Sequence, residues 1–216
     1  MESNRVALKT LALATAGVVG IELLVRWGIG QWGFAPLAGT ALSRLIDIAW
    51  MALLVSGCPQ GWAHIGLGRG SWLPGLGRGL IWSAGFGALA ALGWGVLLAA
   101  GIDPLRLLHP GPVARPANPA LLFLVGGFIG PFAEEMLFRG LVYDYLRRWG
   151  FWPALALSTL IFTLLHAGAA AVPITQIVGG LVFATAYEIE KKILVPITIH
   201  VLGNLAIFSV AQILRF

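Results

Sequence analysis

Six polar side chains in the second half of the chain are of the types that transfer protons or hold ions. They stand in otherwise apolar stretches that read PFAEEMLFRG, FTLLH and HVLGN. The six are Glu134, Glu135, Arg139, His166, His200 and Asn204. Carboxylates and imidazoles exchange protons near neutral pH, and ionisable groups at membrane depth commonly mark catalytic or ion-handling sites. The set therefore predicts a site of one of these two kinds.

The spacing of these residues indicates which of them share a helix face. Glu135 and Arg139 are four residues apart, as are His200 and Asn204, so each pair lies on one face of a helix. Glu134 lies about 100° round the helix from Glu135 and about 140° from Arg139. We expect Glu135 to form a structural ion pair with Arg139, while Glu134 points elsewhere and stays available for chemistry.

The composition places this set in a membrane. Of the 216 residues, 58% are hydrophobic and 11% are charged, and the mean hydropathy is +0.88. A soluble domain is about 45–50% apolar and roughly 25% charged, and a chain this short has too little interior for the excess. The apolar runs are continuous, which argues against alternating barrel strands. The sequence predicts an all-α polytopic transmembrane helical bundle.

Runs of about 20 apolar residues, long enough to cross a bilayer, predict about seven spanning helices. Their expected bounds are 6–27, 37–58, 79–100, 119–145, 151–171, 173–187 and 193–214. Residues 66–75 are expected to form an interfacial segment, and the proline-rich stretch 103–118 an extended loop. This loop divides variable N-terminal helices in 1–118 from a catalytic core in 119–216. An eighth short span, or a helix broken at Pro196, is the alternative for the C-terminal end.

The loop charges predict the orientation of the chain. Cytoplasmic loops of membrane proteins carry an excess of Lys and Arg. If the N-terminus is cytoplasmic, the loops on the cytoplasmic side carry more Lys and Arg than those on the other side, which favours an N-in, C-out arrangement. Measured from the cytoplasmic helix ends, the polar set then lies roughly 10–22 Å deep at 1.5 Å per residue. Tilted helices can bring these groups to one level. We expect an integral protein of a bacterial or archaeal cell membrane.

Other polar residues receive structural interpretations. Glu22, Arg26, Arg44 and Asp47 are expected near helix ends or paired between the first two helices. His64 and His109 are expected in solvated loops. The single cysteine, Cys58, excludes an internal disulfide. The net charge of +5 is scattered along the chain, so nucleic acid is not an expected partner.

At the polar set, the sequence resembles the CPBP family of CAAX prenyl endopeptidases and bacteriocin-processing enzymes, also called the Abi family. The family pattern is EExxxR, then FxxxH, then HxxxN or HxxxB. Here these motifs stand in the same order at 134–139, 162–166 and 200–204. The resemblance covers about residues 120–213. It implies an intramembrane endopeptidase with a site open toward the cytoplasmic side and a peptide or lipid-modified protein as substrate.

The resemblance also implies a role for each motif residue. Glu134 would be the general base that activates water, assisted by His166. His200 and Asn204 would form the oxyanion hole. The supporting residues would be Glu135, Arg139 and Phe162. No serine or cysteine stands beside a histidine in these motifs, which disfavours a covalent acyl-enzyme.

The sequence leaves metal dependence and function class open. The helical HExxH zinc motif is absent, and Asn204 beside His200 suits an oxyanion site, so we expect hydrolysis without a cofactor. If zinc is present, its ligands are His166, His200 and Glu134. From another class, the same residues could serve a proton- or ion-coupled transporter, although the chain shows no internal repeat. A bacteriocin-immunity membrane protein with the same fold is the third interpretation.

Overall fold

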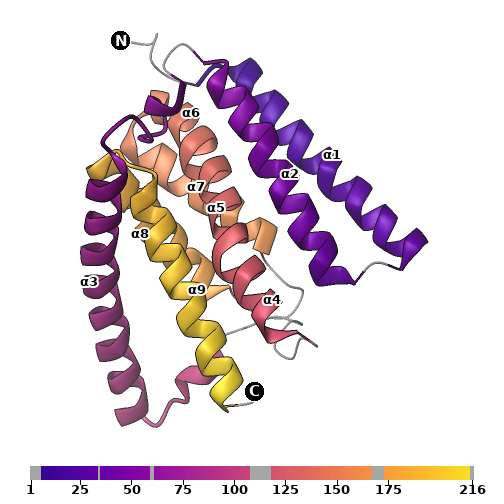
Figure 1. Cartoon of the computed structure of the whole chain (residues 1–216). Helices are drawn as coiled ribbons and strands as arrows, with labels where there is room; N and C mark the ends of the chain where they lie inside the picture. The colour runs from indigo at the N-terminus through magenta and orange to yellow at the C-terminus, as the bar shows by residue number, and fades with distance from the viewer. Residues whose placement is uncertain (1–5, 34, 59–60, 108–117, 167–172, 215–216) are drawn as a thin grey trace.

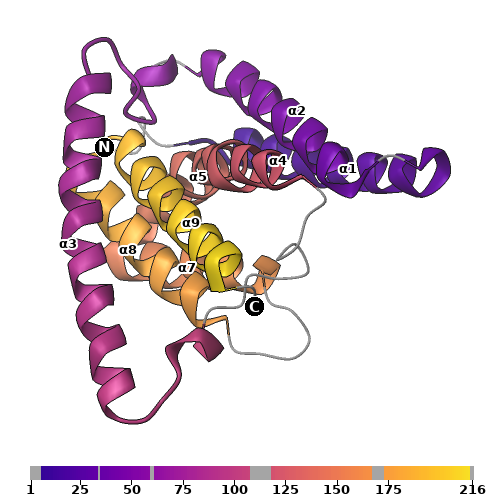
Figure 2. The same cartoon turned by 60° about the horizontal axis from the view of Figure 1, so that its bottom comes forward.

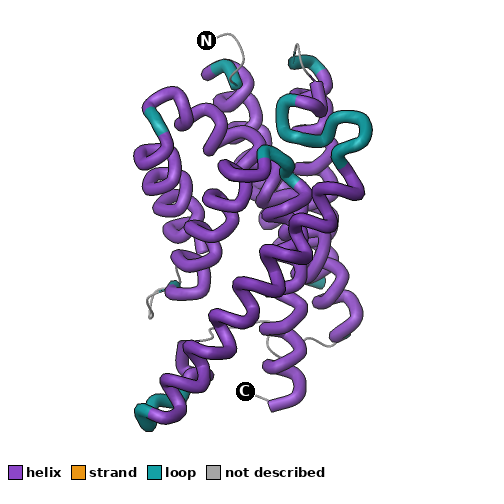
Figure 3. Tube along the Cα trace, turned by 90° about the vertical axis from the view of Figure 1, so that its left-hand side faces the viewer, coloured by secondary structure: helices purple, strands orange, loops and turns teal. Residues whose placement is uncertain are grey.

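The computed structural model describes residues 6–33, 35–58, 61–107, 118–166 and 173–214. The described residues form helices and the loops between them, without strands (Figure 3). The long helices are α1 (Leu8–Trp32), α2 (Pro36–Ser56), α3 (Trp72–Ala99), α7 (Phe151–His166), α8 (Ile174–Glu190) and α9 (Leu194–Leu214), together with one composite helix described next. The predicted all-α polytopic bundle is confirmed.

The composite helix runs without a break from Pro119 to Trp149 and changes its winding along the way. It comprises α4 (Pro119–Leu124), the π-helical η5 (Val125–Ile129), α5 (Gly130–Glu135), the π-helical η6 (Met136–Tyr143), α6 (Asp144–Leu146) and the 3₁₀ turn η7 (Arg147–Trp149). Figures 1 and 2 show α5 inside the bundle, with the α1–α2 pair on one side and α8, α9 and α3 on the other. The sequence predicted one regular helix here and missed both π segments.

Helix length separates two groups among the described elements. α1, α2, α3, the composite helix and α9 are long and apolar enough to cross a membrane, which makes the chain an integral membrane protein. α7 has 16 residues and α8 has 17. At 1.5 Å per residue these two are about 24–26 Å long, somewhat short of a hydrocarbon core of about 30 Å. The sequence placed a span at each of the seven positions, and five of them meet the criteria of length and composition.

Several predicted helix bounds differ from the observed ones. α3 begins at Trp72, so the last four residues of the expected interfacial segment are helical. Pro74 is tolerated there because the first turn needs no N–H donor from it. Pro196 is likewise in the first turn of α9, so the helix is not broken at this residue. The last residues of the predicted span 151–171, and His109, lie outside the described residues.

Close helix contacts hold the front half against the back half. α3 runs along α9, and a Cβ built on Gly79 would lie 2.6 Å from the Cβ of Thr198, so only glycine permits this approach. At one end of the bundle, Asp144 accepts the Val6 backbone N–H at 2.8 Å and lies 3.0 Å from His64 Nε2. The His64 side chain is 8% exposed, so the expectation of a solvated histidine is wrong. It is buried because it pairs with Asp144.

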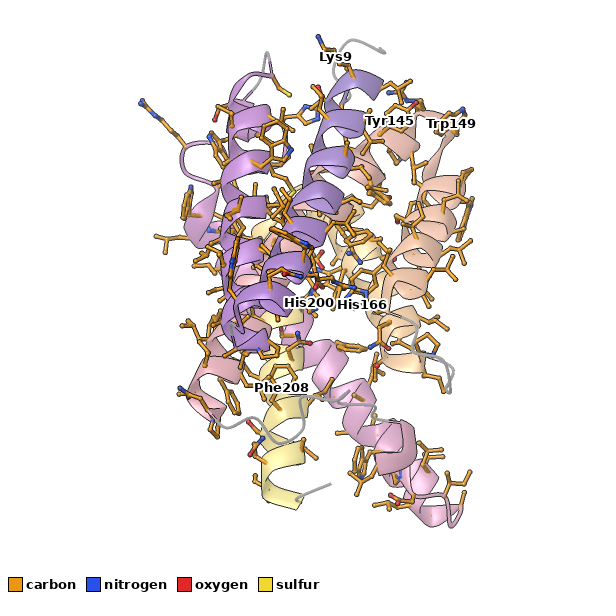
Figure 4. The ribbon with its side chains drawn as sticks, turned by 90° about the vertical axis from the view of Figure 1, so that its right-hand side faces the viewer. Lys9, Tyr145, Trp149, His166, His200 and Phe208 are labelled. Atoms are coloured by element: carbon orange, nitrogen blue, oxygen red, sulfur yellow. The ribbon has the colours of Figure 1, made fainter. Side chains whose placement is uncertain are left out.

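The loop charges lead to a prediction about the two faces of the membrane. Reporter fusions after Trp149 and after Phe216 are expected to report opposite sides, with Trp149 cytoplasmic. Figure 4 shows Trp149 at the same end of the bundle as Lys9, so a fusion close to Lys9 should agree with the one after Trp149. The same side for the fusions after Trp149 and Phe216 would contradict the seven-span arrangement.

Candidate active site

Glu135 and Arg139 form the buried ion pair that the spacing predicts. The Glu135 and Arg139 side chains are 0% and 1% exposed, respectively. Arg139 Nη1 donates to Glu135 Oε1 at 3.2 Å, and Arg139 Nε lies 3.1 Å from Oε2. Arg139 Nη2 donates to the backbone carbonyl of Gly180 on α8 at 3.3 Å. The pair therefore neutralises two charges and also connects the composite helix to α8.

The same carboxylate holds His200. Glu135 Oε1 lies 2.8 Å from His200 Nδ1. Because an ionised carboxylate only accepts hydrogen bonds, Nδ1 carries the proton in this contact. The Phe183 ring stacks on His200, with ring centroids 4.7 Å apart and an interplanar angle of 22°. The His200 ring is thus fixed in position, with Nε2 directed away from Glu135.

Glu134 lies between the two imidazoles. Its Oε1 is 3.5 Å from His166 Nε2, and its Oε2 is 3.8 Å from His200 Nε2. Both distances exceed the 2.7–3.2 Å of a direct N–H···O hydrogen bond. Figure 4 shows His166 and His200 at one level, midway along the bundle. The prediction that Glu134 stays outside the Glu135–Arg139 ion pair agrees with this geometry.

Phe162 orients His166 in two ways. Its backbone carbonyl accepts from His166 Nδ1 at 2.8 Å, so Nε2, which faces Glu134, is an acceptor in the neutral ring and a donor in the doubly protonated ring. Its ring lies against the His166 ring, with centroids 4.4 Å apart. The Arg139 guanidinium carbon is 5.1 Å from the Phe162 ring centroid and 5.3 Å from that of Phe183. Sequence reasoning missed Phe183, because an aromatic residue in an apolar helix carries no signal of its own.

Asn204 faces the η5 segment. Its Nδ2 donates to the Gly126 carbonyl at 2.8 Å. In η5 the N–H of Gly130 bonds to the carbonyl of Val125, five residues earlier. By the same five-residue pattern, the carbonyl of Gly126 would accept from the N–H of residue 131. That residue is Pro131, which has no N–H, so the Gly126 carbonyl is left for Asn204. This bond fixes the orientation of the amide on α9 and leaves the second N–H of Nδ2 for another acceptor.

The structure thus brings predicted residues of all three motifs together, with Glu135, Arg139 and His200 buried, Glu134 partly buried, and the His166 side chain 30% exposed. Glu134 and Glu135 come from α5, His166 from α7, and His200 and Asn204 from α9. Among the described residues, no group of three or more His, Cys, Asp or Glu side chains is arranged to hold a metal ion. The residues that would ligate zinc, His166, His200 and Glu134, nevertheless lie together.

The fold and site define an integral membrane helical bundle with a glutamate–histidine centre between its helices. Residues 116–206 match the family model described as type II CAAX prenyl endopeptidase Rce1-like. The resemblance seen in the motifs is therefore confirmed over this part of the chain.

Two curated proteins are similar to the chain. The membrane-embedded CAAX protease MroQ of Staphylococcus aureus is 36% identical over 93 residues, 40% of this chain and 37% of that protein. YdiL of Bacillus subtilis, a candidate membrane peptidase, is 32% identical over 85 residues, 39% of this chain and 34% of that protein. The similarity thus spans little more than a third of the length of each relative. No solved structure matches the chain significantly.

Proposed function

We propose that this protein is an intramembrane endopeptidase in which Glu134 activates water for attack on a peptide bond. The observation that carries the proposal is the position of Glu134 between two imidazole Nε2 atoms, at 3.5 and 3.8 Å. A water molecule on Glu134 gives one proton to the carboxylate as its oxygen attacks the carbonyl carbon, and Glu134 passes this proton to the nitrogen that leaves when the C–N bond breaks. Neutral His166 presents an acceptor on the same side, because its Nδ1 is bonded to a backbone carbonyl.

In this proposal His200 and Asn204 stabilise the oxyanion. The hydrogen bond to Glu135 places a proton on His200 Nδ1, so Nε2 becomes a donor only when the ring is doubly protonated. His200 therefore acts as an imidazolium. Asn204 contributes the N–H that Gly126 does not use. Donors placed before the reaction stabilise the developing charge without reorganisation.

The names of two relatives and the position of the site inside the bundle support a proposal for the substrate class. Two similar proteins are named as a membrane-embedded CAAX protease and a membrane peptidase. We assign a CAAX-type specificity for a membrane-associated peptide, with or without a lipid modification. The site lies inside the bundle, so the scissile bond must enter the membrane region to reach Glu134.

A comparison of peptides from cells tests this function. Proteome-wide peptide profiles of cells with wild-type protein and with Glu134→Gln are expected to differ at C-terminal segments of membrane-associated proteins. Purified protein in liposomes should then cleave the peptides so identified. Identical profiles, together with no cleavage of any membrane peptide by purified wild-type protein, would refute the function.

Metal removal distinguishes the proposed mechanism from zinc hydrolysis. Exhaustive chelation is expected to leave wild-type activity unchanged, and the purified protein should contain well under one zinc per chain. In a zinc hydrolase the metal activates the water, so chelation removes activity and added zinc restores it. Activity that disappears with a chelator and returns with zinc would make His166, His200 and Glu134 the ligands.

Asn204→Ala tests the oxyanion hole separately. Loss of one donor typically lowers turnover about 10²–10³-fold. We expect that loss in kcat, with substrate binding little changed, in a cleavage assay with a parallel binding measurement. Asn204→Asp is the matched control, because it keeps the size of the side chain but replaces the donor with an acceptor. Wild-type turnover in Asn204→Ala would remove Asn204 from the mechanism.

A further inference from the structure

Charged side chains of the front half meet between α1 and α2. Arg44 Nη1 lies 2.8 Å from Glu22 Oε1 and 3.2 Å from Asp47 Oδ2. The Ser43 hydroxyl also donates to Glu22 Oε1, at 3.1 Å. We call Glu22, Arg44 and Asp47 the α1–α2 cluster. The pairing between the first two helices that the sequence allowed is present.

The α1–α2 cluster lies far from the helix ends. Helix α1 has 25 residues, and Glu22 lies 14 positions after its first residue. Helix α2 has 21 residues, and Arg44 lies eight positions after its first residue. At 1.5 Å per residue, Arg44 is about 12 Å from one end of α2 and about 18 Å from the other. Of the two placements that the sequence allowed, the structure therefore has the pairing between helices and not the position near helix ends. Charged groups at such depth are rare and commonly line a polar pathway.

One oxygen of the α1–α2 cluster has no hydrogen-bond donor. Asp47 is 1% exposed, and its Oδ2 accepts from Arg44 Nη1. Its Oδ1 is buried without a hydrogen-bond partner in the part of the chain that the structure describes. Buried polar atoms of this kind are commonly satisfied by water, which needs two to four polar partners. The Glu22 and Arg44 side chains, each 25% exposed, are suitable further partners.

The α1–α2 cluster lies next to the candidate active site. α2 packs against α5, the helix that carries Glu134. Arg44 is within electrostatic range of both Glu134 and His166. On the other side, Arg26 is 78% exposed and lies 4.0 Å from Glu22. Charged side chains therefore form a row from the exposed Arg26 on α1 to Asp47 on α2, the helix that packs against α5.

Hydrolysis consumes one water for each peptide bond, and the lipid around the bundle supplies none. We propose that the α1–α2 cluster binds water and delivers it to Glu134. The use of this water in hydrolysis at Glu134 rests on the proposed function, whereas the binding of water by the cluster does not. The front helices, which lie outside the matched residues 116–206, then supply the second substrate of the reaction.

Cysteine labelling measures the hydration directly. In a Cys58→Ser background, Arg44→Cys is compared with its neighbour Leu45→Cys in liposomes, using a charged thiol reagent that does not cross membranes. Leu45 is 52% exposed on the same helix, so it controls for steric access. Because the thiolate reacts and forms in water, Arg44→Cys should label at least about tenfold faster, equivalent to one unit of thiol pKa. Equal rates would overturn the proposal.

A second pair of cysteine variants provides the same test if Arg44→Cys does not fold. Glu22→Cys and Leu23→Cys give the same comparison on α1, where Leu23 is 63% exposed and Arg44 keeps Asp47 as its partner. Faster labelling of Glu22→Cys supports the water route, and equal rates contradict it. Labelling needs no catalysis. Faster labelling of the cluster cysteines in a protein that cleaves no peptide therefore refutes the proposed function and leaves the water route standing. Equal labelling rates in an active protease refute the water route and leave the proposed function standing.

Substitution of Asp47 links the water to turnover. Asp47→Leu, which has no acceptor, is expected to lower kcat roughly tenfold with KM nearly unchanged, as for loss of one hydrogen bond. Asp47→Asn keeps an acceptor oxygen at the same position and should retain most of the activity. A purely structural role would affect both variants through stability and would not separate kcat from KM. An increase in KM alone would make the cluster a peptide-binding element instead.

Discussion

Glu134→Gln is expected to abolish measurable turnover while the fold and the melting temperature in detergent stay nearly unchanged. Glutamine has the same shape but cannot accept a proton from water, and loss of a general base typically costs about 10²–10⁴ in rate. Among the described residues, the shortest polar contact of Glu134 is the 3.5 Å one with His166, so little stabilisation is lost. The measurements are a cleavage assay in liposomes and a thermal melt.

Glu134→Asp is the control for this prediction. It keeps the base but withdraws the carboxylate from the imidazoles, so a small residual activity should remain. Full activity of Glu134→Gln would remove Glu134 from the chemistry. A large loss of melting temperature in Glu134→Gln would mean that its role is structural and that the two carboxylates have exchanged functions.

Glu135→Gln is expected to lower stability strongly, by about 3–5 kcal/mol, because it leaves the Arg139 charge buried without its counter-ion. The structure adds a second consequence, since Glu135 Oε1 also holds His200 Nδ1 at 2.8 Å. Turnover should therefore fall even at temperatures where the variant is folded. Thermal unfolding in detergent and a cleavage assay below the melting temperature measure the two effects.

A double substitution separates the ion pair from the histidine contact. Replacing both partners of a buried pair by neutral groups is often close to neutral for stability. Glu135→Gln with Arg139→Met should therefore recover a large part of the stability but not the turnover, because His200 still lacks its carboxylate. If Glu135→Gln melts like the wild-type protein, the ion pair has no structural role.

Local spacing was enough for the sequence to predict several features of the site. A helix repeats every 3.6 residues, so the four-residue separation of Glu135 and Arg139 determined their pairing without knowledge of the tertiary structure. The pairing survives the change from α to π winding at Met136. Long apolar runs predicted the helices of the bundle because a bilayer requires a minimum length of apolar chain. The class of fold and the chemical types in the site were therefore readable from the residues.

Only the tertiary structure determined which groups meet across helices. Glu135 bonds His200, 65 positions away, and Asn204 bonds the Gly126 carbonyl that Pro131 leaves unpaired. For Glu22, Arg44 and Asp47 the sequence allowed two placements, near helix ends or paired between the first two helices, and only the structure decided for the pairing. Periodicity relates residues on one helix. Contacts between helices depend on tilt, rotation and depth, which are set by the packing of all the helices together and have no signature in any single segment.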